Sequence, residues 1–313
     1  MKPTTLRDSS GAVLVAGAIN TDLVARLRLA PEAGETVTGT GFAIFGGGKG
    51  ANQATAAARA GAPTAILGAL GDDDFGRQRR SDLEAEGINI ASVATVSDTA
   101  SGVALITVEE STGQNRIAYV PGATLTVTPE QATAAIARVR PAVLLTTLEL
   151  PRATLTVLYA EARLIGAIIL FNATPEAATG RELLARTDFL IVNESEAADL
   201  LEQEVRPQDA KAAALSLLDL GPRAAVITLG KHGAVIADGK SVTHIAAPEV
   251  KVVDTTGAGD AFCGAMAAGL AAGLDPVEAA RIGVITGSLA ATRHGAQPSI
   301  PTRAEVNAMR RGR

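Results

Sequence analysis

The sequence predicts an α/β fold with a mostly parallel central sheet, helices on both faces of that sheet, and a small antiparallel β lid. The first observation is a set of short apolar, β-branched runs, at residues 13–19, 64–67, 142–147, 165–171, 189–192 and 224–229. The second is a set of alanine-rich stretches between them, at 51–60, 130–139 and 210–220. The third is a pair of segments that break this rhythm, at 20–46 and 100–122.

Each observation predicts one kind of element. Apolar runs without alternation indicate parallel strands that are buried on both faces, and helical stretches between them complete βα units. The stretch 210–220 closes on Gly221 and Pro222, which is a helix stop signal. Residues 103–108 alternate and precede a turn at 112–115, as antiparallel strands do. We therefore expect a single domain, 1–313, with lid strands inserted at about 20–46 and 100–122.

Composition excludes several classes of function. The net charge of −5 supplies no basic field for nucleic acid, and 3% aromatic residues with no Trp make base stacking improbable. Cys263 is the only cysteine, which excludes a disulfide framework and fits a reducing compartment, so we expect a cytoplasmic protein. No stretch approaches the ~18 apolar residues of a membrane helix, so no membrane partner is expected.

The most informative segment is 253–262, where a strand end runs through Gly257, Ala258 and Gly259 into a helix. Backbone N–H groups and the helix dipole then point at one spot, which is a geometry that binds anions. Asp260 lies in the first helical turn and is placed as a general base, because phosphoryl transfer to a hydroxyl needs a proton acceptor. The alternative is an ordinary strand-to-helix turn in which Asp260 favours the dipole.

A second glycine cluster runs from Gly46 to Gly50 around Lys49. It is not a P-loop, because Gly50 follows the lysine where Ser or Thr is required. The turn could let a small polyol lie against the backbone, with Asn52 on the next helix as donor and acceptor. A plain loop-to-helix turn explains the same pattern.

Polar residues follow several predicted strands, at the edge where ligands collect in α/β sheets. Asn20, Thr21 and Asp22 follow the first strand, and Glu149 follows the third. Asn and Asp can bracket sugar hydroxyls, but both are also common turn residues.

Two more strands end in polar or glycine-rich segments. Asn193 could reach a nucleotide phosphate and Glu196 could hold Mg²⁺ through water, or the two could form a helix capping box. Residues 228–233 (Thr228, Leu229, Gly230, Lys231, His232 and Gly233) could take the nucleotide or form a hairpin turn.

Other enzyme classes lack their motifs. His232, His244 and His294 are scattered, and there is neither a His-x-x-x-His pair nor a Gly-x-Ser-x-Gly elbow. No Gly-x-Gly-x-x-Gly follows the first strand, so an NAD-dependent oxidoreductase is excluded.

Taken together, the ordered motifs resemble the ribokinase branch of the PfkB carbohydrate kinase family. The resemblance spans about residues 13–301 and rests on Asn20-x-Asp22, Gly47 to Asn52, Gly71-Asp72-Asp73, Glu149, Asn193-x-x-Glu196, Thr228-Leu229-Gly230, Asp254 to Asp260 and Thr292 to Ser299. It implies a ribokinase-like three-layer αβα domain with a β lid.

The resemblance also implies roles for individual residues. Asp260 would deprotonate the sugar hydroxyl, and Gly257, Ala258 and Gly259 would form the anion hole. The sugar would be held by Asn20, Thr21, Asp22, Gly47, Gly48, Lys49, Gly50, Ala51, Asn52 and Glu149. The ATP site would comprise Asn193, residues 228–233, Gly259 and Gly283. An activating K⁺ would be bound by Asp254, Thr256, Ala290, Arg293, Gly295 and Ser299, an oxygen cage that suits a hard cation.

The implied function is ATP-dependent phosphorylation of D-ribose at O5, with Mg²⁺ and K⁺ and with a homodimer joined through the lids. Deoxyribose, fructose or a nucleoside are alternative substrates. A sugar-binding regulator without catalysis is an alternative of another class, although such a protein need not retain Asp260 beside an anion hole.

Overall fold

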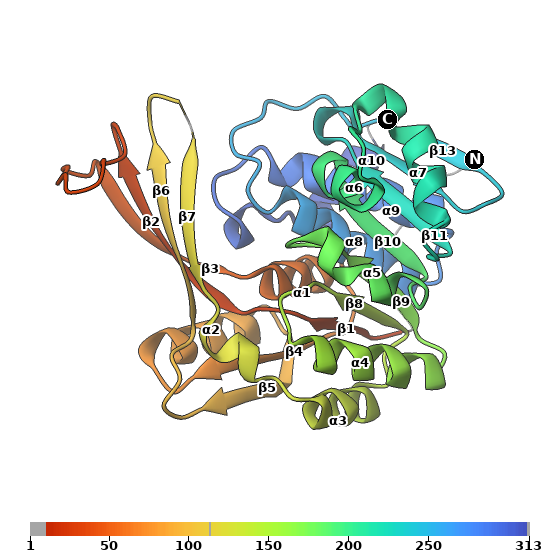
Figure 1. The fold of residues 1–313 in the computed structure, drawn as a ribbon, viewed down its shortest axis with the longest axis horizontal. Coiled ribbons are helices and arrows are strands. Elements are labelled where there is room, and N and C mark those ends of the chain that lie inside the picture. The colour runs from red at the N-terminus through yellow and green to blue at the C-terminus, as the bar shows by residue number, and fades with distance from the viewer. Residues whose placement is uncertain (1–10, 113, 312–313) are drawn as a thin grey trace.

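The computed structural model describes residues 11–112 and 114–311, which form one large sheet, ten helices and a small projecting sheet (Figure 1). The large sheet has nine strands in the order β13-β12-β11-β10-β9-β8-β1-β4-β5. In chain order they are β1 (Val13–Ala16), β4 (Thr64–Gly71), β5 (Asn89–Val96), β8 (Val143–Thr146), β9 (Ile168–Asn172), β10 (Phe189–Asn193), β11 (Ala224–Thr228), β12 (Ala234–Ala237) and β13 (Val242–Ile245). Neighbours from β11 to β5 pair in parallel, whereas β12 and β13 form an antiparallel edge.

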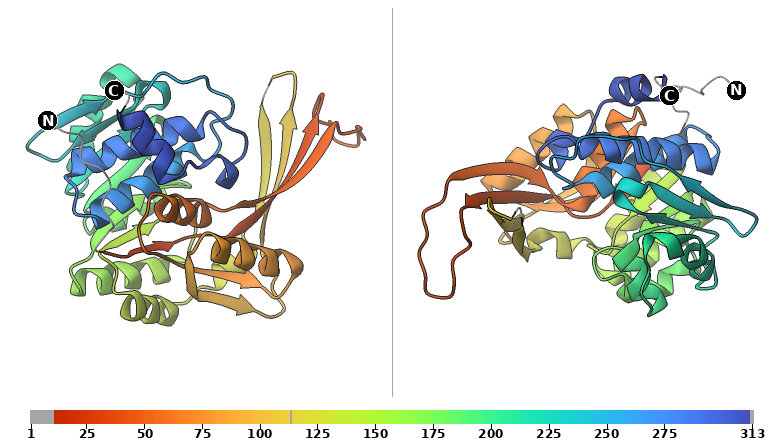
Figure 2. Two further views of the ribbon diagram at one scale, coloured as in Figure 1. Left: turned by 180° about the vertical axis from the view of Figure 1, so that it is seen from behind. Right: turned by 90° about the horizontal axis from the view of Figure 1, so that it is seen from above.

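Helices cover both faces of this sheet (Figure 2). One face packs against α3 (Pro129–Val139), α4 (Arg152–Leu164), α5 (Arg181–Leu184), α6 (Glu194–Leu201) and α7 (Ala210–Leu218). The other packs against α1 (Lys49–Arg59), α2 (Asp74–Ala85), α8 (Ala258–Ala271), α9 (Pro276–Ala290) and α10 (Arg303–Arg311). Side chains alternate along β1 between the two cores, Leu14 and Ala16 in one and Val13 and Val15 in the other. This double burial explains why the strands read as continuous apolar runs.

The small sheet projects from one side of the molecule (Figure 1) and consists of β2 (Asn20–Leu27), β3 (Gly41–Gly47), β6 (Gly102–Glu109) and β7 (Asn115–Val120). Its order is β3-β2-β6-β7. The outer pairs are antiparallel, but the central pair β2–β6 is parallel. Both central strands leave the large sheet in the same direction, so this pair is parallel, and the antiparallel pairing predicted for the whole lid holds only for its outer pairs.

The predicted fold class is confirmed, with corrections at the element ends. The apolar run 13–19 is not one strand, because β1 ends at Ala16 and buried residues 17–19 carry the chain across to β2. The predicted strand 165–171 begins too early, since β9 starts at Ile168, Ile165 is the C-cap of α4 and Gly166 has φ of +74°. The described part of the chain contains no helix that is both long and apolar enough to cross a bilayer.

Candidate active site

The glycine turn opens α8 as the sequence predicts, but the strand expected before it is absent, because β13 ends at Ile245 and residues 246–257 form an irregular loop that leads to Ala258. Gly257 caps the helix with φ of +76°, and a Cβ on it would lie 2.9 Å from Ala296 Cα. A side chain is therefore excluded there on both steric and conformational grounds. Ala258 and Gly259 open the helix, and the Ala258 N–H already donates to the Thr255 carbonyl (3.1 Å). The predicted anion hole thus includes one donor that is engaged within the turn.

Asp260 follows in the first turn of α8 and is buried, with 8% of its surface exposed. Asn52 Nδ2 donates to its Oδ2 (2.9 Å) and Gln53 Nε2 donates to its Oδ1 (3.0 Å). Both amides come from the start of α1, so two helices far apart in sequence meet at this carboxylate. An acceptor held on both oxygens is fixed in place to receive a proton.

The turn before α1 brings Lys49 and Glu149 to the same place. Gly48 has φ of +86°, and a Cβ would lie 2.5 Å from the Ala18 carbonyl oxygen. Glu149 Oε2 accepts from the N–H of Ala18 (2.8 Å) and of Gly50 (3.2 Å), and Oε1 accepts from the N–H of Lys49 (3.2 Å). Glu149 therefore holds the helix start, because Gly48 offers no capping side chain.

Charges in this cluster influence one another. Burial disfavours charged Lys49, but the carboxylates of Asp260 and Glu149 outweigh it and raise the pKa of the ammonium. Burial raises the pKa of Glu149, against the Ala18 N–H and Lys49, which lower it. The ammonium thus stays charged at the meeting point of two carboxylates, where it can bind an anionic or hydroxylated ligand.

Asn20, Thr21 and Asp22 start β2, on the small sheet. Asp22 lies over Gly47, where any Cβ would fall 2.1 Å from Oδ1 of Asp22. Burial raises the pKa of Asp22 to about 6, with Arg79 opposing the shift and Asp260 adding to it. Among the described residues, the buried Asn20 Oδ1 and Thr21 Oγ1 have no hydrogen-bond partner. Gly50 and Ala51 are buried in the first turn of α1.

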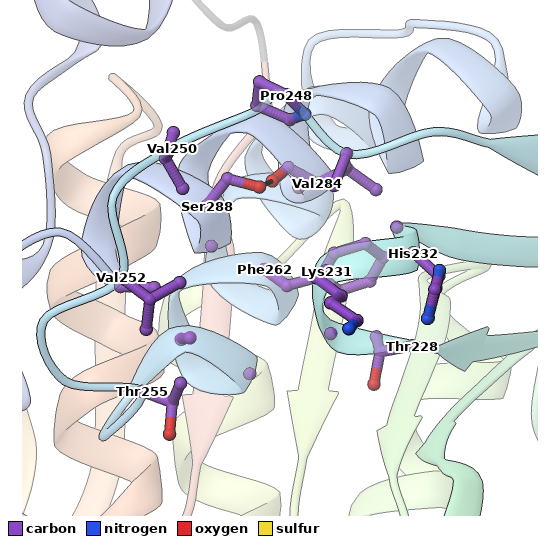
Figure 3. A pocket seen from close by; sticks show the side chains of 18 of the residues that line it. Thr228, Lys231, His232, Pro248, Val250, Val252, Thr255, Phe262, Val284 and Ser288 are labelled. Carbon is purple, nitrogen blue, oxygen red and sulfur yellow. Dashed lines mark hydrogen bonds between the residues drawn. The ribbon is translucent and has the colours of Figure 1, made fainter. Parts of the chain in front are cut away.

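A large cavity of about 620 Å³ borders the start of α8, where Ala258, Gly259 and Phe262 line it (Figure 3). Most of its wall is backbone and apolar side chain, including Phe262 from α8 and Val252 from the preceding loop. The predicted nucleotide residues that line it are Thr228, Gly230, Lys231, His232, Gly233, Gly259 and Gly283. Gly283 has no room for a side chain, because a Cβ would lie 2.8 Å from the Phe262 ring.

Three residues predicted to bind the nucleotide or magnesium, Leu229, Asn193 and Glu196, also make hydrogen bonds that stabilise the local backbone. Leu229 is buried and its N–H donates to the Gly233 carbonyl (2.8 Å), so residues 228–233 form a hairpin turn; all of them except Leu229 also line the cavity. Asn193 and Glu196 form the capping box of α6, with Oδ1 accepting from the Glu196 N–H (2.8 Å) and Oε2 accepting from the Asn193 N–H (2.9 Å). Burial raises the pKa of Glu196, although the hydrogen bond from the Asn193 N–H acts to lower it.

The predicted cation residues gather beside the glycine turn. Asp254 Oδ1 accepts from the Thr256 N–H (2.9 Å) and Oδ2 accepts from the Gly295 N–H (3.0 Å). Burial alone would raise the pKa of Asp254, but these donors lower it, so the carboxylate stays ionised. Ser299 is fully buried and donates to the Ala296 carbonyl (2.7 Å). The Ala290 carbonyl accepts from the Arg293 N–H (3.1 Å).

Comparison with known proteins shows the family of this chain. Residues 11–303 match the sequence model of the pfkB family of carbohydrate kinases. The chain belongs to this family. It is 37% identical over 308 residues to the ribokinase of Schizosaccharomyces pombe, across 94% of this chain and 96% of the relative. It is 34% identical over 302 residues to the deoxyribokinase of Salmonella typhi, across 94% and 97%.

The fold of this pfkB kinase is also found in solved structures. The structure of Arabidopsis thaliana ribokinase complexed with ribose and ATP superposes with a TM-score of 0.85 at 27% identity, covering 96% of this chain and 98% of that one. The predicted resemblance is therefore confirmed, and the chain is a sugar kinase of the pfkB family.

Three residues of the cluster in this pfkB kinase were not predicted from the sequence. Gln53 is fully buried and contacts Asp260, and its position directly after Asn52 was the available signal. Arg79 on α2 is 6% exposed and acts electrostatically on Asp22. Tyr119 on β7 lies beside Asn20 and Thr124, so the small sheet places a phenol over this site. Nothing local in the sequence marks the last two.

Proposed function

We propose that this pfkB kinase transfers the γ-phosphoryl group of ATP to O5 of D-ribose. One observation carries the proposal: Asp260 lies between a polar cluster suited to a polyol and a cavity of nucleotide size. Gly259 lines the cavity and Asp260 is its neighbour, so the acceptor of the proton and the site of the phosphates are adjacent. The ribokinase relatives support ribose as the sugar.

Each part of the site has a distinct task in this reaction. Asn20, Asp22 and Asn52 orient the sugar through hydroxyl hydrogen bonds, with Lys49 beside them. Asp260 accepts the hydroxyl proton as the oxygen attacks phosphorus. The amides of the glycine turn and the N-terminus of α8 stabilise charge on the phosphoryl oxygens. The small sheet limits access of water to the γ-phosphate.

Magnesium fits this site as a partner of the nucleotide. The described residues hold no group of three or more His, Cys, Asp or Glu side chains around a common point, so the phosphates must supply most of the ligands. Glu196 would contribute through water. The ion, when bound, neutralises charge on the transferring phosphoryl group.

Potassium fits the loop beside the glycine turn. Its donors are all oxygens: the Asp254 carboxylate, the Ser299 hydroxyl and carbonyls of Thr256, Ala290, Arg293 and Gly295. Gln297 of this loop lies against Gly46, where a Cβ would fall 2.4 Å from its Oε1. A cation that holds this loop in place would therefore stabilise the glycine turn before α8. It would also stabilise β3, which leads to the sugar-binding turn at Gly48.

The test is an ADP-release assay with a panel of sugars, with and without K⁺. We expect turnover to be highest with D-ribose, to require Mg²⁺ and to rise with K⁺. Product analysis should place the phosphate on O5. Turnover without a ribose preference would contradict the substrate assignment, and equal rates without K⁺ would contradict the cation site.

Deoxyribose is the second candidate substrate, since the Salmonella typhi deoxyribokinase is nearly as similar as the ribokinases. The two sugars differ by one hydroxyl, and a site built to hydrogen-bond that hydroxyl rejects the analogue without it. The ratio of kcat/KM for ribose and 2-deoxyribose in the same panel separates these two assignments.

A homodimer joined through the small sheets is also part of the proposal. Phe42, Ile44, Leu105 and Val120 are about half exposed or more. Cross-strand register puts them on one face of the small sheet, opposite the face of Asp22. Such an apolar patch is typical of an interface. Light scattering should give a dimer mass, and Leu105→Lys should lower it, whereas a monomeric wild-type chain would contradict the proposal.

A further inference from the structure

A chain of buried hydrogen bonds connects Asp260 to the backbone of the large sheet. Gln53 Nε2 donates to Asp260 Oδ1 (3.0 Å) and also to Asn172 Oδ1 (2.9 Å). Asn172 Nδ2 donates to the Ile191 carbonyl (3.2 Å). Gln53 is fully buried and Asn172 is 8% exposed. Four elements, α8, α1, β9 and β10, therefore share one line of polar contacts.

The Ile191 carbonyl dictates the orientation of both amides. A carbonyl can only accept, so Asn172 must present its Nδ2 to Ile191 and its Oδ1 to Gln53. Gln53 must then present Nε2, whose two hydrogens reach Asn172 and Asp260. Turning either amide over would place acceptor against acceptor inside the protein, which is costly without water.

Asn52 is held differently. Its Nδ2 donates to Asp260 Oδ2 (2.9 Å) and to no second side chain of the described residues. Its buried Oδ1 has no hydrogen-bond partner among those residues, and neither has Gln53 Oε1, so the two amides differ in the second contact that the Gln53 nitrogen makes with Asn172. Its amide can therefore turn over without breaking a second contact. The two oxygens of Asp260 thus differ: Oδ1 faces a donor that cannot change, whereas Oδ2 faces an amide that can offer either a donor or an acceptor.

We propose that Gln53 and Asn172 form a positioning relay, in which Oδ1 of Asp260 remains a permanent acceptor and Oδ2 receives the proton of the sugar hydroxyl. This rests on the function proposed above. In the step, the hydroxyl O–H bond breaks and its proton moves to Oδ2, while the hydroxyl oxygen bonds to the γ-phosphorus. The bond from that phosphorus to the bridging oxygen breaks, and ADP leaves with the electron pair. Asn52 then turns its Oδ1 toward the new Oδ2–H.

The experiment compares Gln53→Met, Asn172→Leu and the double variant with the wild-type chain. Gln53→Met removes the donor to Oδ1 at similar volume, and we expect kcat to fall about 10- to 100-fold, because small misplacements of a reacting group have effects of this size. The KM for ribose should stay within about threefold. Asn172→Leu should lower kcat less, because Gln53 keeps its direct contact.

The double variant distinguishes a relay from two separate structural roles. Substitutions that act through the same group, here the Gln53 amide, do not have additive effects. The double variant should therefore lose no more kcat than Gln53→Met alone. Multiplied losses would overturn the relay, as would an unchanged kcat in Gln53→Met. Thr55→Val is a matched control, since Thr55 is equally buried on α1 with an unpartnered Oγ1, and it should leave kcat unchanged.

Folding and the proposed function are tested separately. Thermal unfolding and ATP binding establish that each variant is folded. If Gln53→Met cannot be purified, Asn172→Leu decides: a lower kcat at similar KM supports the relay, and an unchanged kcat overturns it. If the wild-type chain phosphorylates no sugar, the proposed function fails before any comparison. If it does and the variants retain its kcat, only the relay fails.

Discussion

The two halves of the site on either side of the α8 turn are built from different materials. On the sugar side, side chains meet side chains: Asn52 and Gln53 hold Asp260, and Glu149 holds three backbone N–H groups. On the nucleotide side, the cavity of about 620 Å³ is lined mostly by glycines, alanines and apolar side chains such as Phe262. The sugar side is therefore a network of hydrogen bonds, whereas the nucleotide side is a mainly apolar cavity.

Because the two halves are built differently, they should differ in their sensitivity to mutation. A buried polar network fails when one partner is removed, because the others are left unsatisfied. An apolar cavity open to solvent can adjust to a small change in its wall. Substitutions on the sugar side should therefore change rate and sugar affinity steeply, and those on the nucleotide side should change ATP affinity modestly.

The largest effect is expected where the two halves meet. Asp260→Ala removes the proton acceptor, so kcat should fall by about 10²- to 10⁴-fold. ATP binding, measured by calorimetry, should stay within a few-fold, because the cavity wall does not include the Asp260 side chain. A variant that retains turnover within a few-fold of wild type would remove Asp260 from the mechanism.

The next largest effect tests the backbone under the sugar. Gly48→Ala places a Cβ 2.5 Å from the Ala18 carbonyl at a φ of +86°, so the turn must move. We expect the KM for ribose to rise about tenfold, equivalent to ~1.4 kcal/mol. Gly166→Ala is the control: its φ is +74° with nothing within 4 Å, so it shares the backbone strain. If both variants keep the wild-type KM, the turn does not bind the sugar.

The pH dependence of sugar binding tests Asp22. Because its pKa is raised to about 6, Asp22 gains a proton as pH falls through that value and loses its capacity as an acceptor for sugar hydroxyls. The KM for ribose should rise about tenfold from pH 7 to pH 5. Asp22→Asn should flatten this dependence. The sign for stability is opposite: a raised pKa means that ionisation opposes folding, so this contribution is present below pH 3.8 and is lost as pH rises through 6.

The smallest effect is expected on the nucleotide side. Gly283→Ala places a Cβ 2.8 Å from the Phe262 ring and 2.9 Å from the Phe262 carbonyl oxygen, so α8 and α9 must move slightly apart beside the cavity. The KM for ATP should rise about threefold to tenfold, because a modest overpacking of the cavity wall weakens ATP binding. Steady-state kinetics with each substrate varied will show whether the KM for ribose stays constant. An equal rise for both substrates would contradict the division into two halves.

Local patterns were enough to predict the architecture and the positions of the main ligand-binding turns. Doubly buried strands read as apolar runs, and Gly48 and Gly257 stand where the backbone has positive φ and no space for a Cβ. Hairpin β12–β13 was not predicted as an edge of the sheet, because its short strands carry no distinct period. The capping box of Asn193 and Glu196 was readable from spacing, since its contacts lie within three residues.

The fold class, the family and the residues at the strand ends could be predicted from the sequence, because each of these depends on residues that are close along the chain. The side chains that contact Asp260 could be identified only in the folded chain. Gln53 is 207 residues away from it and 119 from Asn172, and the Ile191 carbonyl that orients both amides has no side-chain signature at all. Hydrogen bonds of this kind depend on how four elements pack, so only the folded chain shows which oxygen of the base is held and which is available.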